Sequence, residues 1–438
     1  MNSIWTESAK LPQFEKLEGS ARTDVLIIGG GIAGILCAYF LQENGVDYIL
    51  AEKETICSGI TKNTTAKITS QHGLIYDRLL KSAGAEKAAL YLEANQNSVR
   101  KYFELCGQIN CDFEIKTNYV YSLDDRRKLE NEVKALDQIG FCAELSEAEE
   151  LPFPTAGAVG FRNQAQFHPL RMLAGIARGL HIYEHTFVKE LAEHTAVAET
   201  GSIAFQKLIV ATHFPIDNKH GMYFMKMYQH RSYVIALADT ASVNGMYVDE
   251  ARGGMSFRSY RDLLLVGGGG HRTGKKGGGW QELRAFAETY YPLAEEKYCW
   301  AAQDCMTLDQ IPYIGPYSKR MPDCFVATGF HKWGMTSAMT AAMLLTDLVM
   351  EQENPYAEVF SPSRSMMKPQ LLFNSLEFLA GLLTVSGKRC PHLGCALKWN
   401  EAEHTWDCSC HGSRFDGEGE LLDNPANGNA HFSKKGIR

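Results

Sequence analysis

Residues 24–44 restrict the fold of this chain more than any other stretch. They read DVLII, then GGGIAG, then ILCAYFLQEN: a short apolar run, a glycine turn, and apolar residues at helical spacing. The glycines form the GxGxxG pattern, at Gly29, Gly31 and Gly34. They permit a tight turn, close approach of a pyrophosphate, and packing of the helix on the strand. A second apolar run, 46–51, ends in Glu52, a carboxylate placed to bind an adenosine ribose. We therefore predict a dinucleotide-binding βαβ unit in an α/β domain.

Two later segments favour FAD over NAD. Residues 57–73, CSGITKNTTAKITSQHG, are rich in Ser, Thr and Gly and are placed to follow a pyrophosphate towards a flavin ring, with Thr64 and Thr65 as predicted contacts. Residues 324–335, CFVATGFHKWGM, indicate a strand and a glycine turn that lead into a helix. The N-terminus of that helix can stabilise a reduced flavin through its N–H groups and positive dipole end. The predicted contacts there are Gly329, Gly334 and Met335.

Residues 390–414 contain four cysteines and three histidines. Structural zinc sites usually carry paired thiolates as CxxC units. Here each half instead offers one Cys and one His, as Cys390-x-His392 and Cys408-x-x-His411. Such a set suits a Rieske [2Fe–2S] cluster, in which imidazoles replace thiolates on one iron. Zinc and a plain disulfide framework are the alternatives.

The strings CPHLGC (390–395) and CSCHGS (408–413) resemble the two ligand boxes of Rieske proteins. The resemblance implies that Cys390 and Cys408 bind one iron, and that His392 and His411 bind the other. The remaining cysteines, Cys395 and Cys410, take equivalent places in the two boxes, so that a disulfide between them would clamp the ligand loops.

The rest of the chain resembles the D-amino-acid oxidase and sarcosine oxidase superfamily of flavoproteins, and in particular its Rieske-fused members. The resemblance rests on TTAKITSQHGLIY (64–76), on WAAQD (300–304) with DQIPYIGP (309–316), and on ATGFHKWGMT (327–336). It implies an α/β FAD-binding Rossmann-type domain with an inserted antiparallel-sheet substrate domain, and places Val188 near the adenine. Relatives with covalent flavin carry a His near SGITKN, where this chain has Asn63, so we expect non-covalent FAD.

The resemblance also predicts the domain boundaries. Only a short stretch separates Pro369 from Cys390, so we expect a small, shortened all-β Rieske module. The expected segments are FAD binding at about 20–90, 166–215 and 307–350, the substrate domain at about 91–165 and 216–306, a linker at 351–369, and the Rieske module at 370–438.

Composition excludes some partners. A net charge of -7 with 45% hydrophobic and 22% charged residues offers no basic footprint for nucleic acid. The N-terminal residues lack the apolar core of a signal peptide, and no apolar run is long enough to span a membrane. We therefore expect a cytoplasmic protein whose partners are a small-molecule substrate and a one-electron acceptor or donor protein.

Four residues are candidates for catalysis. His271 and Arg272 lie in GGGGHRTGKKGGG, expected as a loop after a substrate-domain strand, where they would bind a substrate carboxylate or act as a base. His72 would reach the flavin face, and Lys332 would place a cation beside the ring edge. A solvated glycine-rich loop and a structural histidine are the alternatives.

These predictions lead to one main hypothesis, a dehydrogenase. A small amine or amino-acid-like substrate would reduce the flavin, and the cluster would pass the electrons on singly. The superfamily resemblance alone supplies the amine. A redox sensor or electron-transfer protein without organic turnover is the alternative. A Rieske oxygenase would need a mononuclear iron site, for which we find no matching ligands.

Overall fold

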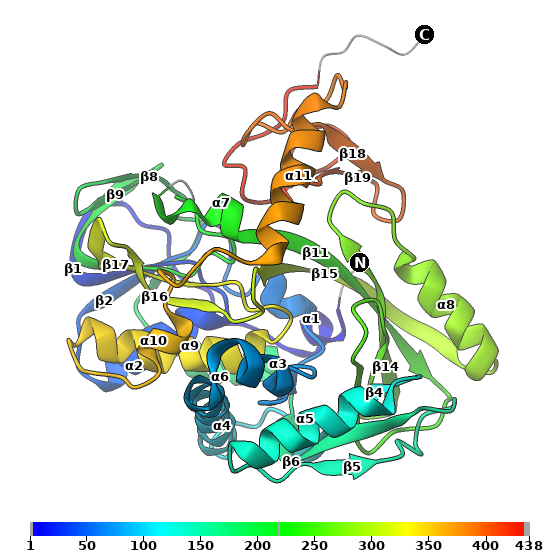
Figure 1. Ribbon diagram of the computed structural model, residues 1–438. Coiled ribbons are helices and arrows are strands. Elements are labelled where there is room, and N and C mark those ends of the chain that lie inside the picture. The colour runs from blue at the N-terminus through cyan, green and yellow to red at the C-terminus, as the bar shows by residue number, and fades with distance from the viewer. Residues whose placement is uncertain (1–2, 218–219, 433–438) are drawn as a thin grey trace.

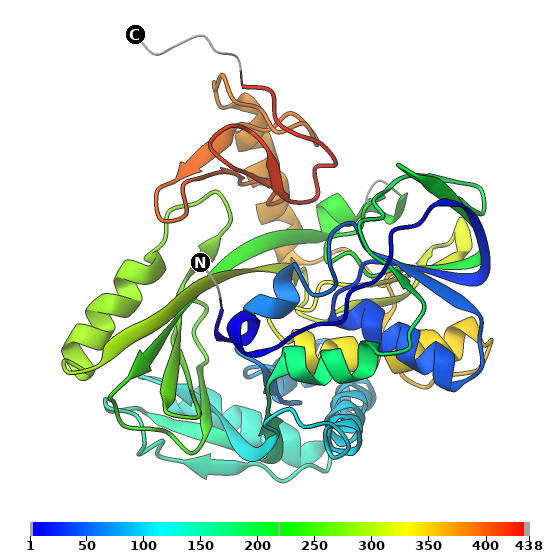
Figure 2. The ribbon, with the colours of Figure 1, turned by 180° about the vertical axis from the view of Figure 1, so that it is seen from behind.

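The computed structural model describes residues 3–217 and 220–432, which form three sheets and their covering helices (Figures 1 and 2). The predicted strand–turn–helix forms as β1 (Gly19–Ile28) and α2 (Ile32–Glu43). The last four residues of β1 are buried, as expected of a strand covered on both faces. This unit starts the first sheet, at the left of Figure 1.

The first sheet runs in the order β16-β17-β10-β1-β2-β7, with β8 and β9 attached to β10. Its central pairs are parallel, and β16 joins β17 in antiparallel fashion. The other strands are β2 (Tyr48–Ala51), β7 (Ile182–Tyr183), β8 (Val188–Ala192), β9 (Thr195–Ala198), β10 (Gly201–Val210), β16 (Tyr313–Ser318) and β17 (Met321–Thr328).

Helices cover this sheet, and α2 packs on α6 and α9. Most residues of α2 are buried because the helix lies between the sheet and these neighbours. The remaining helices are α1 (Ile4–Ser8), η1 (Ile60–Asn63), α3 (Tyr76–Ala83), α4 (Ala85–Cys106), α5 (Arg126–Gln138), α6 (Pro169–Ala177), η2 (His220–Met222), α7 (Tyr223–Lys226), α8 (Gly279–Tyr290), α9 (Gly334–Val349), α10 (Ala357–Phe360) and α11 (Pro369–Leu383).

The second sheet runs in the order β15-β11-β14-β13-β12-β4-β6-β3, with β5 on β6. All its pairs in the described residues are antiparallel except β12 with β4. Its longest strands, β11 and β15, pair along their whole length and reach the base of the third sheet (Figure 1). The strands are β3 (Lys67–Ile68), β4 (Glu114–Ser122), β5 (Glu144–Ser146), β6 (Gly157–Gln166), β11 (Met227–Ala238), β12 (Met246–Asp249), β13 (Ser256–Tyr260), β14 (Leu263–Arg272) and β15 (Glu295–Thr307).

The third sheet is small and antiparallel, with α11 leading into it. Its strands are β18 (Leu397–Asn400), β19 (Thr405–Cys408), β20 (Arg414–Phe415) and β21 (Leu421–Asp423). The predicted fold class is confirmed: a Rossmann-type α/β domain, a largely antiparallel second sheet, and a small separate module. The stretch 370–438 is not purely β, because α11 occupies its start.

Candidate functional site

The turn between β1 and α2 leaves no room for side chains. Gly29 has a φ of +110°, and a Cβ there would lie 2.6 Å from the carbonyl oxygen of Ala211. A Cβ on Gly34 would lie 1.9 Å from the carbonyl oxygen of Gly29, so α2 packs directly on the turn. Thr61 Oγ1 accepts a hydrogen bond from the backbone N–H of Ile32 (3.0 Å). The N-terminus of α2 is thereby held where it favours an anionic phosphate.

Glu52 follows the end of β2. Its carboxylate accepts hydrogen bonds from the backbone N–H groups of Gly30 (2.6 Å) and Glu54 (3.0 Å). Burial raises the pKa of Glu52, and these two hydrogen bonds oppose the rise. The side chain is therefore fixed at the strand end where dinucleotide sites place an acidic residue.

One cavity of about 520 Å³ connects the glycine turn with the start of α9. Gly34 lies outside its lining because it packs on Gly29 instead. The other predicted cofactor contacts all line the cavity: Gly29, Gly31, Glu52, Thr64, Thr65, Val188, Gly329, Gly334 and Met335. At the far end, α9 begins at Gly334, and the first-turn N–H groups of a helix have no acceptor within it. Residues predicted for adenosine, pyrophosphate and flavin thus share one continuous space, which fits FAD.

His72 lines this cavity, but its ring is held by other protein groups. Nδ1 lies 2.6 Å from the hydroxyl of Tyr91, and Nε2 lies 2.9 Å both from the carbonyl oxygen of Thr69 and from Thr336 Oγ1. Burial lowers the pKa of His72 to about 3, and its ring stacks on Trp333 at 5.1 Å. His72 is therefore neutral and braces the first turn of α9, a geometry that matches the structural alternative better than a base.

The predicted loop position of His271 and Arg272 is wrong, because the glycine run before them belongs to strand β14, which ends at Arg272. Neither residue lines the cavity. Arg272 donates hydrogen bonds to the carbonyl oxygens of Ser409 and Cys410, both at 3.1 Å, and so holds a cluster-ligand loop. His271 stacks on Tyr233 with ring centroids 5.6 Å apart.

Lys332 does face the cavity, and His230 and Asp304 line the same cavity. Burial lowers the pKa of Lys332, and Asp304 opposes this. Burial raises the pKa of Asp304, and Lys332 opposes that in turn, so the two charges lie close enough to influence each other. His230 pairs with Asp304 across β11 and β15, and burial lowers its pKa to about 2. The sequence signal for Asp304 was a lone carboxylate within the mostly apolar stretch 298–308.

The backbone beside Lys332 is strained. Both His331 and Lys332 adopt left-handed conformations, with φ of 50° and 71°. Such residues cost free energy and persist where the surrounding structure enforces them, often at functional sites.

The four predicted cluster ligands come together in two loops beside the third sheet. The two boxes fold alike: Cys390 N–H bonds the Cys395 carbonyl and Cys408 N–H bonds the Ser413 carbonyl, both at 2.9 Å. The rings of His392 and His411 lie 5.1 Å apart. A side-chain hydrogen bond with Cys408 lowers the pKa of Cys390, with a further contribution from Ser413, and the same hydrogen bond raises the pKa of Cys408. Two cysteine sulfurs and two imidazoles thus lie together, a donor set that fits a [2Fe–2S] cluster.

Cys395 and Cys410 form a disulfide, with Cα atoms 6.7 Å apart. Their sulfurs lie within 4.8 Å of the sulfur of Cys408. Because two of these three sulfurs are bonded to each other, they do not offer a three-thiolate metal site. The disulfide instead joins the two ligand loops.

His411 is also fixed from the flavin-binding body. Burial lowers its pKa to about 3, and a hydrogen bond with the backbone of Phe224 opposes this. A neutral imidazole is the form that binds iron, and a hydrogen bond to its second nitrogen orients a ligand histidine.

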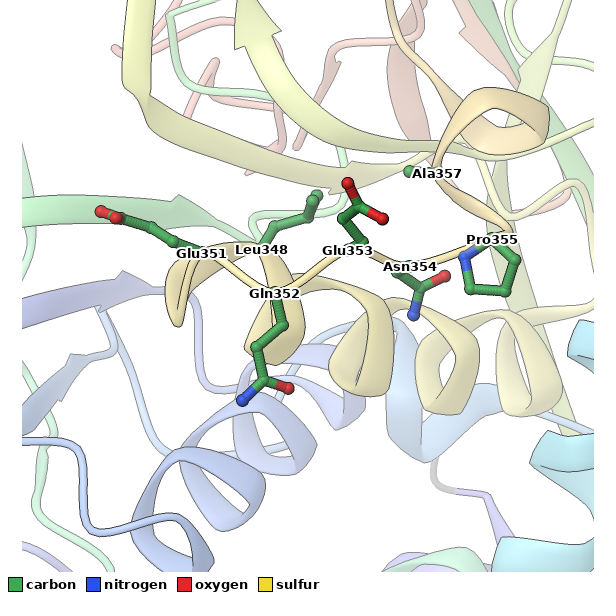
Figure 3. Close-up of a pocket in the computed structure, with 7 residues that line it drawn as sticks. All are labelled: Leu348, Glu351, Gln352, Glu353, Asn354, Pro355 and Ala357. Carbon is green, nitrogen blue, oxygen red and sulfur yellow. The ribbon is translucent and has the colours of Figure 1, made fainter.

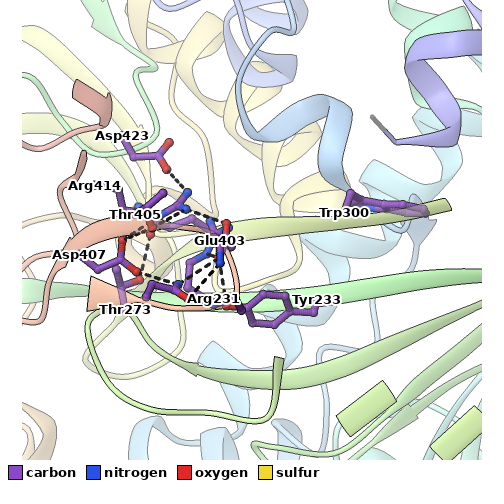
Figure 4. Close-up of polar contacts among 12 residues, drawn as sticks. Arg231, Tyr233, Thr273, Trp300, Glu403, Thr405, Asp407, Arg414 and Asp423 are labelled. Atoms are coloured by element: carbon purple, nitrogen blue, oxygen red, sulfur yellow. Dashed lines mark hydrogen bonds and ion pairs between the residues drawn. The ribbon is translucent and has the colours of Figure 1, made fainter. Parts of the chain in front are cut away.

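Figure 4 shows the buried charges that attach the module to β11. Glu403 accepts hydrogen bonds from Arg231 Nε (2.9 Å), from the hydroxyl of Tyr233 (3.0 Å) and from Arg414 Nη2 (2.7 Å). Arg414 also donates to Asp423 at 2.9 Å. The network ties β19–β21 to the second sheet.

The ribbon of β11 and β15 lies between the cavity and the cluster loops. His230, Ser232 and Asp304 line the cavity. Their neighbours point the other way: Gln229 donates to the carbonyl oxygen of His411 (3.2 Å), and Gln303 to that of Gly412 (2.9 Å). Successive side chains of a strand face opposite sides, so one layer of sheet separates the two sites. Module residues also line the cavity itself: Leu421, Leu422, Asp423, Asn424, Ala426 and Asn427.

A second hollow lies at the C-terminal end of α9 (Figure 3). Its polar side chains are Glu351, Gln352, Glu353 and Asn354. Glu351 pairs with Lys207 at 2.8 Å, and its neighbours Gln352 and Glu353 are exposed, so this is a solvated surface. Within residues 3–217 and 220–432, no helix is long and apolar enough to cross a bilayer.

A dinucleotide cavity in a Rossmann-type body, with a two-Cys, two-His module against it, defines a flavoprotein oxidoreductase with an iron–sulfur module. The family model described as FAD dependent oxidoreductase matches residues 24–348, and that of the Rieske [2Fe-2S] domain matches residues 360–433. The chain therefore belongs to the FAD-dependent oxidoreductase family and carries a C-terminal Rieske domain. The resemblance inferred from the motifs is confirmed, and with it FAD and a [2Fe–2S] cluster as cofactors.

Relatives match both parts of the chain. A putative Rieske 2Fe-2S iron-sulfur protein of Bacillus subtilis (strain 168) is 34% identical over 487 aligned residues, which cover 97% of this chain and 96% of the relative. Glycine oxidase from Geobacillus kaustophilus superimposes with a TM-score of 0.66 at 20% identity, over 79% of this chain and 100% of its own. L-Proline dehydrogenase from P. horikoshii superimposes with a TM-score of 0.66 at 18% sequence identity, and the match covers 80% of this chain and 98% of the dehydrogenase. The two structures share the fold of the flavin-binding body.

Proposed function

We propose that the protein is an FAD-dependent dehydrogenase that oxidises a small amine or amino-acid-like substrate and passes electrons through the Rieske cluster to an external one-electron acceptor. When bound, FAD supplies two-electron oxidation of the substrate, and the cluster supplies one-electron transfer. We also keep the cytoplasmic location as a prediction.

The observation that carries this proposal is the shared ribbon of β11 and β15. His230 and Asp304 lie on its cavity face, whereas Gln229 and Gln303 bond the loop of the cluster ligand His411 on the other face. Because the module also forms part of the cavity wall, the two redox sites are adjacent without any rearrangement. An enzyme that only reduced oxygen at its flavin would have no need of this arrangement.

The charges of the cavity support an amino-acid-like substrate. Lys332 offers a cation for a carboxylate, and Asp304, whose pKa burial raises, offers an acceptor for the proton that an amine loses on oxidation to an imine. His230 also lines the cavity, and burial lowers its pKa, so its ring is neutral at ordinary pH. Two proteins of the same fold are named for glycine and L-proline, which agrees with this choice.

The first experiment is an anaerobic screen of amines and amino acids for bleaching of flavin absorbance. Bleaching identifies the substrate class. If no compound bleached the flavin while chemical reductants did, the redox sensor would become the better hypothesis.

The second experiment separates flavin reduction from electron export. Replacing Cys408→Ser removes an iron ligand, so substrate should still bleach the flavin while reduction of cytochrome c, too large to enter the cavity, falls by about 100-fold or more. Cys142→Ser, at an exposed cysteine, is the matched control. FAD content and melting temperature are measured alongside. Wild-type reduction of cytochrome c by folded, FAD-replete Cys408→Ser would remove the cluster from the electron path.

A further inference from the structure

Helix α11 exposes an apolar face on the outside of the Rieske module. The exposed side chains recur three and four residues apart, which places them on one side of the helix. Their exposed fractions are 64% for Leu372, 61% for Phe373, 54% for Leu376, 53% for Leu379 and 81% for Leu383. The face continues at both ends of the helix, since Met367 is 84% exposed and Val385 98%. A contiguous apolar patch of this kind on a folded protein marks an interaction surface.

The opposite side of α11 is already occupied, so the helix cannot turn to bury this face. A Cβ on Gly381 would lie 2.4 Å from Cys410 Sγ, which leaves the helix in direct contact with a ligand loop. The ring of Phe378 lies 5.6 Å from that of His411. Glu377 pairs with Lys275 of the flavin-binding body at 2.7 Å. In Figure 1 this leaves α11 standing free on its outer side.

The sequence around α11 carries more basic than acidic residues. Glu377 is the one acidic residue between Ser363 and Trp399, and its partner is a lysine. Basic residues stand at both ends of α11 and on the neighbouring strand β18, in a chain whose net charge is -7: Lys368, Lys388, Arg389 and Lys398. The exposed stripe itself carries no charge.

We propose that the apolar face of α11 docks on the surface of an anionic lipid bilayer, with the helix lying flat among the headgroups. A helix of 15 residues is about 22 Å long, too short to span a bilayer but suited to interfacial binding, where apolar side chains insert and flanking basic residues contact anionic lipid. Docking there would bring the cluster module to the membrane surface.

The same charges disfavour a second copy of the chain as the occupant. Both ends of α11 are basic, at Lys368 on one side and at Lys388 and Arg389 on the other. A parallel or an antiparallel pair of these helices would therefore bring like charges together. A bilayer rich in anionic lipid offers the complementary charge.

The test is co-sedimentation of the full-length protein, loaded with FAD and cluster, with vesicles of phosphatidylglycerol and phosphatidylcholine or of phosphatidylcholine alone. We expect binding to the anionic vesicles, weaker binding to the neutral ones, and a loss in high salt. The double variant Leu376→Glu, Leu379→Glu should lower the partition coefficient by about tenfold or more. Leu293→Glu, at a site 88% exposed between α8 and β15, is the matched control and should bind as the wild type does.

Flavin and cluster absorbance report whether each variant is folded, so the result does not depend on the proposed activity. Wild-type protein that stayed in the supernatant with anionic vesicles would overturn the proposal, as would a double variant that still bound them. Analytical ultracentrifugation tests whether a second copy of the chain binds this face instead. If the wild type were a dimer that did not bind vesicles, and the double variant were a monomer, the face would be assigned to a second copy.

Discussion

The flavin-binding body and the Rieske module are stabilised in different ways. The body has a large core in which buried residues of the first sheet, α2, α6 and α9 form one cluster. The module's buried cluster is small and half of it is cysteine: Cys390, Cys395, Leu397, Cys408, Cys410, Phe415, Ala426 and Ala430. A module of this size buries too little apolar surface to be stable by itself.

What replaces the missing core is a set of specific links. Within the module these are the Cys395–Cys410 disulfide and the cluster; towards the body they are the ion network at Glu403 and the hydrogen bonds to β11 and β15. Single substitutions should therefore affect the two regions differently. We expect the body to tolerate the loss of one polar contact, and the module to depend on each of its links.

The largest effect is expected for Glu403→Ala. It leaves Arg231 and Arg414 buried without their shared partner, which should destabilise the docked module by about 3–5 kcal/mol. The midpoint temperature of thermal unfolding should fall when it is followed by cluster absorbance. It should fall less when unfolding is followed by flavin fluorescence. Glu401→Ala, at an exposed site, is the control. Equal shifts of both signals would show that the two regions unfold as one.

The same carboxylate gives a pH dependence of known sign. Burial alone would raise the pKa of Glu403, but Arg231 and Arg414 outweigh it and hold the pKa below its usual value of 4.5. A depressed pKa stabilises the folded state above pH 4.5 and loses that contribution as the pH falls through the folded value. The module of the wild type should therefore loosen in acid below about pH 4.5, and Glu403→Ala should show a smaller transition, because Asp423, whose pKa Arg414 also lowers, remains.

The next largest effect is expected on FAD binding by the flavin-binding body, and not on the module. In Gly34→Ala the added Cβ would lie 1.9 Å from a backbone oxygen that cannot move aside, so α2 must shift from the turn. At about 1–3 kcal/mol for such overpacking, FAD affinity should fall roughly 10- to 100-fold while the cluster spectrum stays normal. Gly253→Ala, where a Cβ meets nothing within 4 Å, should bind FAD as the wild type does.

These two regions also differ in how far the sequence predicted them. The glycine turn and the cluster boxes were predictable because their chemistry lies in short stretches, where spacing alone fixes the geometry. His271 and Arg272 were misplaced because the glycines before them have low strand propensity, and only pairing of β14 with β11 and β13 makes them a strand. The cavity wall at 421–427 depends on docking of the module, which no local pattern encodes. Asp304 required the pairing of β15 with β11.

A smaller effect is expected at Lys332. If it binds the substrate carboxylate, Lys332→Met should raise KM about tenfold with a smaller change in kcat. Burial lowers the pKa of this lysine below 10.5, and the cation exists only below its pKa, so kcat/KM of the wild type should fall with rising pH before pH 10.5. The variant should lose this alkaline decline. Lys276→Met, at an exposed lysine, is the control, and an unchanged KM in Lys332→Met would exclude the assigned role.

The smallest effect tests how the module tunes its cluster. Respiratory Rieske proteins carry a Tyr two residues after the Ser of the second box, and here that position is Phe415, fully buried beside Trp406. Ser413 already contributes a hydrogen bond to Cys390, and hydrogen bonds to ligand sulfur raise the potential of such clusters. Phe415→Tyr should therefore raise the midpoint potential, measured by redox titration of the cluster absorbance. Phe432→Tyr adds the same hydroxyl to the other phenylalanine that packs on Trp406 and should leave the potential unchanged. If Phe415→Tyr also left it unchanged, the hydroxyl would not reach a ligand sulfur, and residue 415 would not tune the cluster in this way.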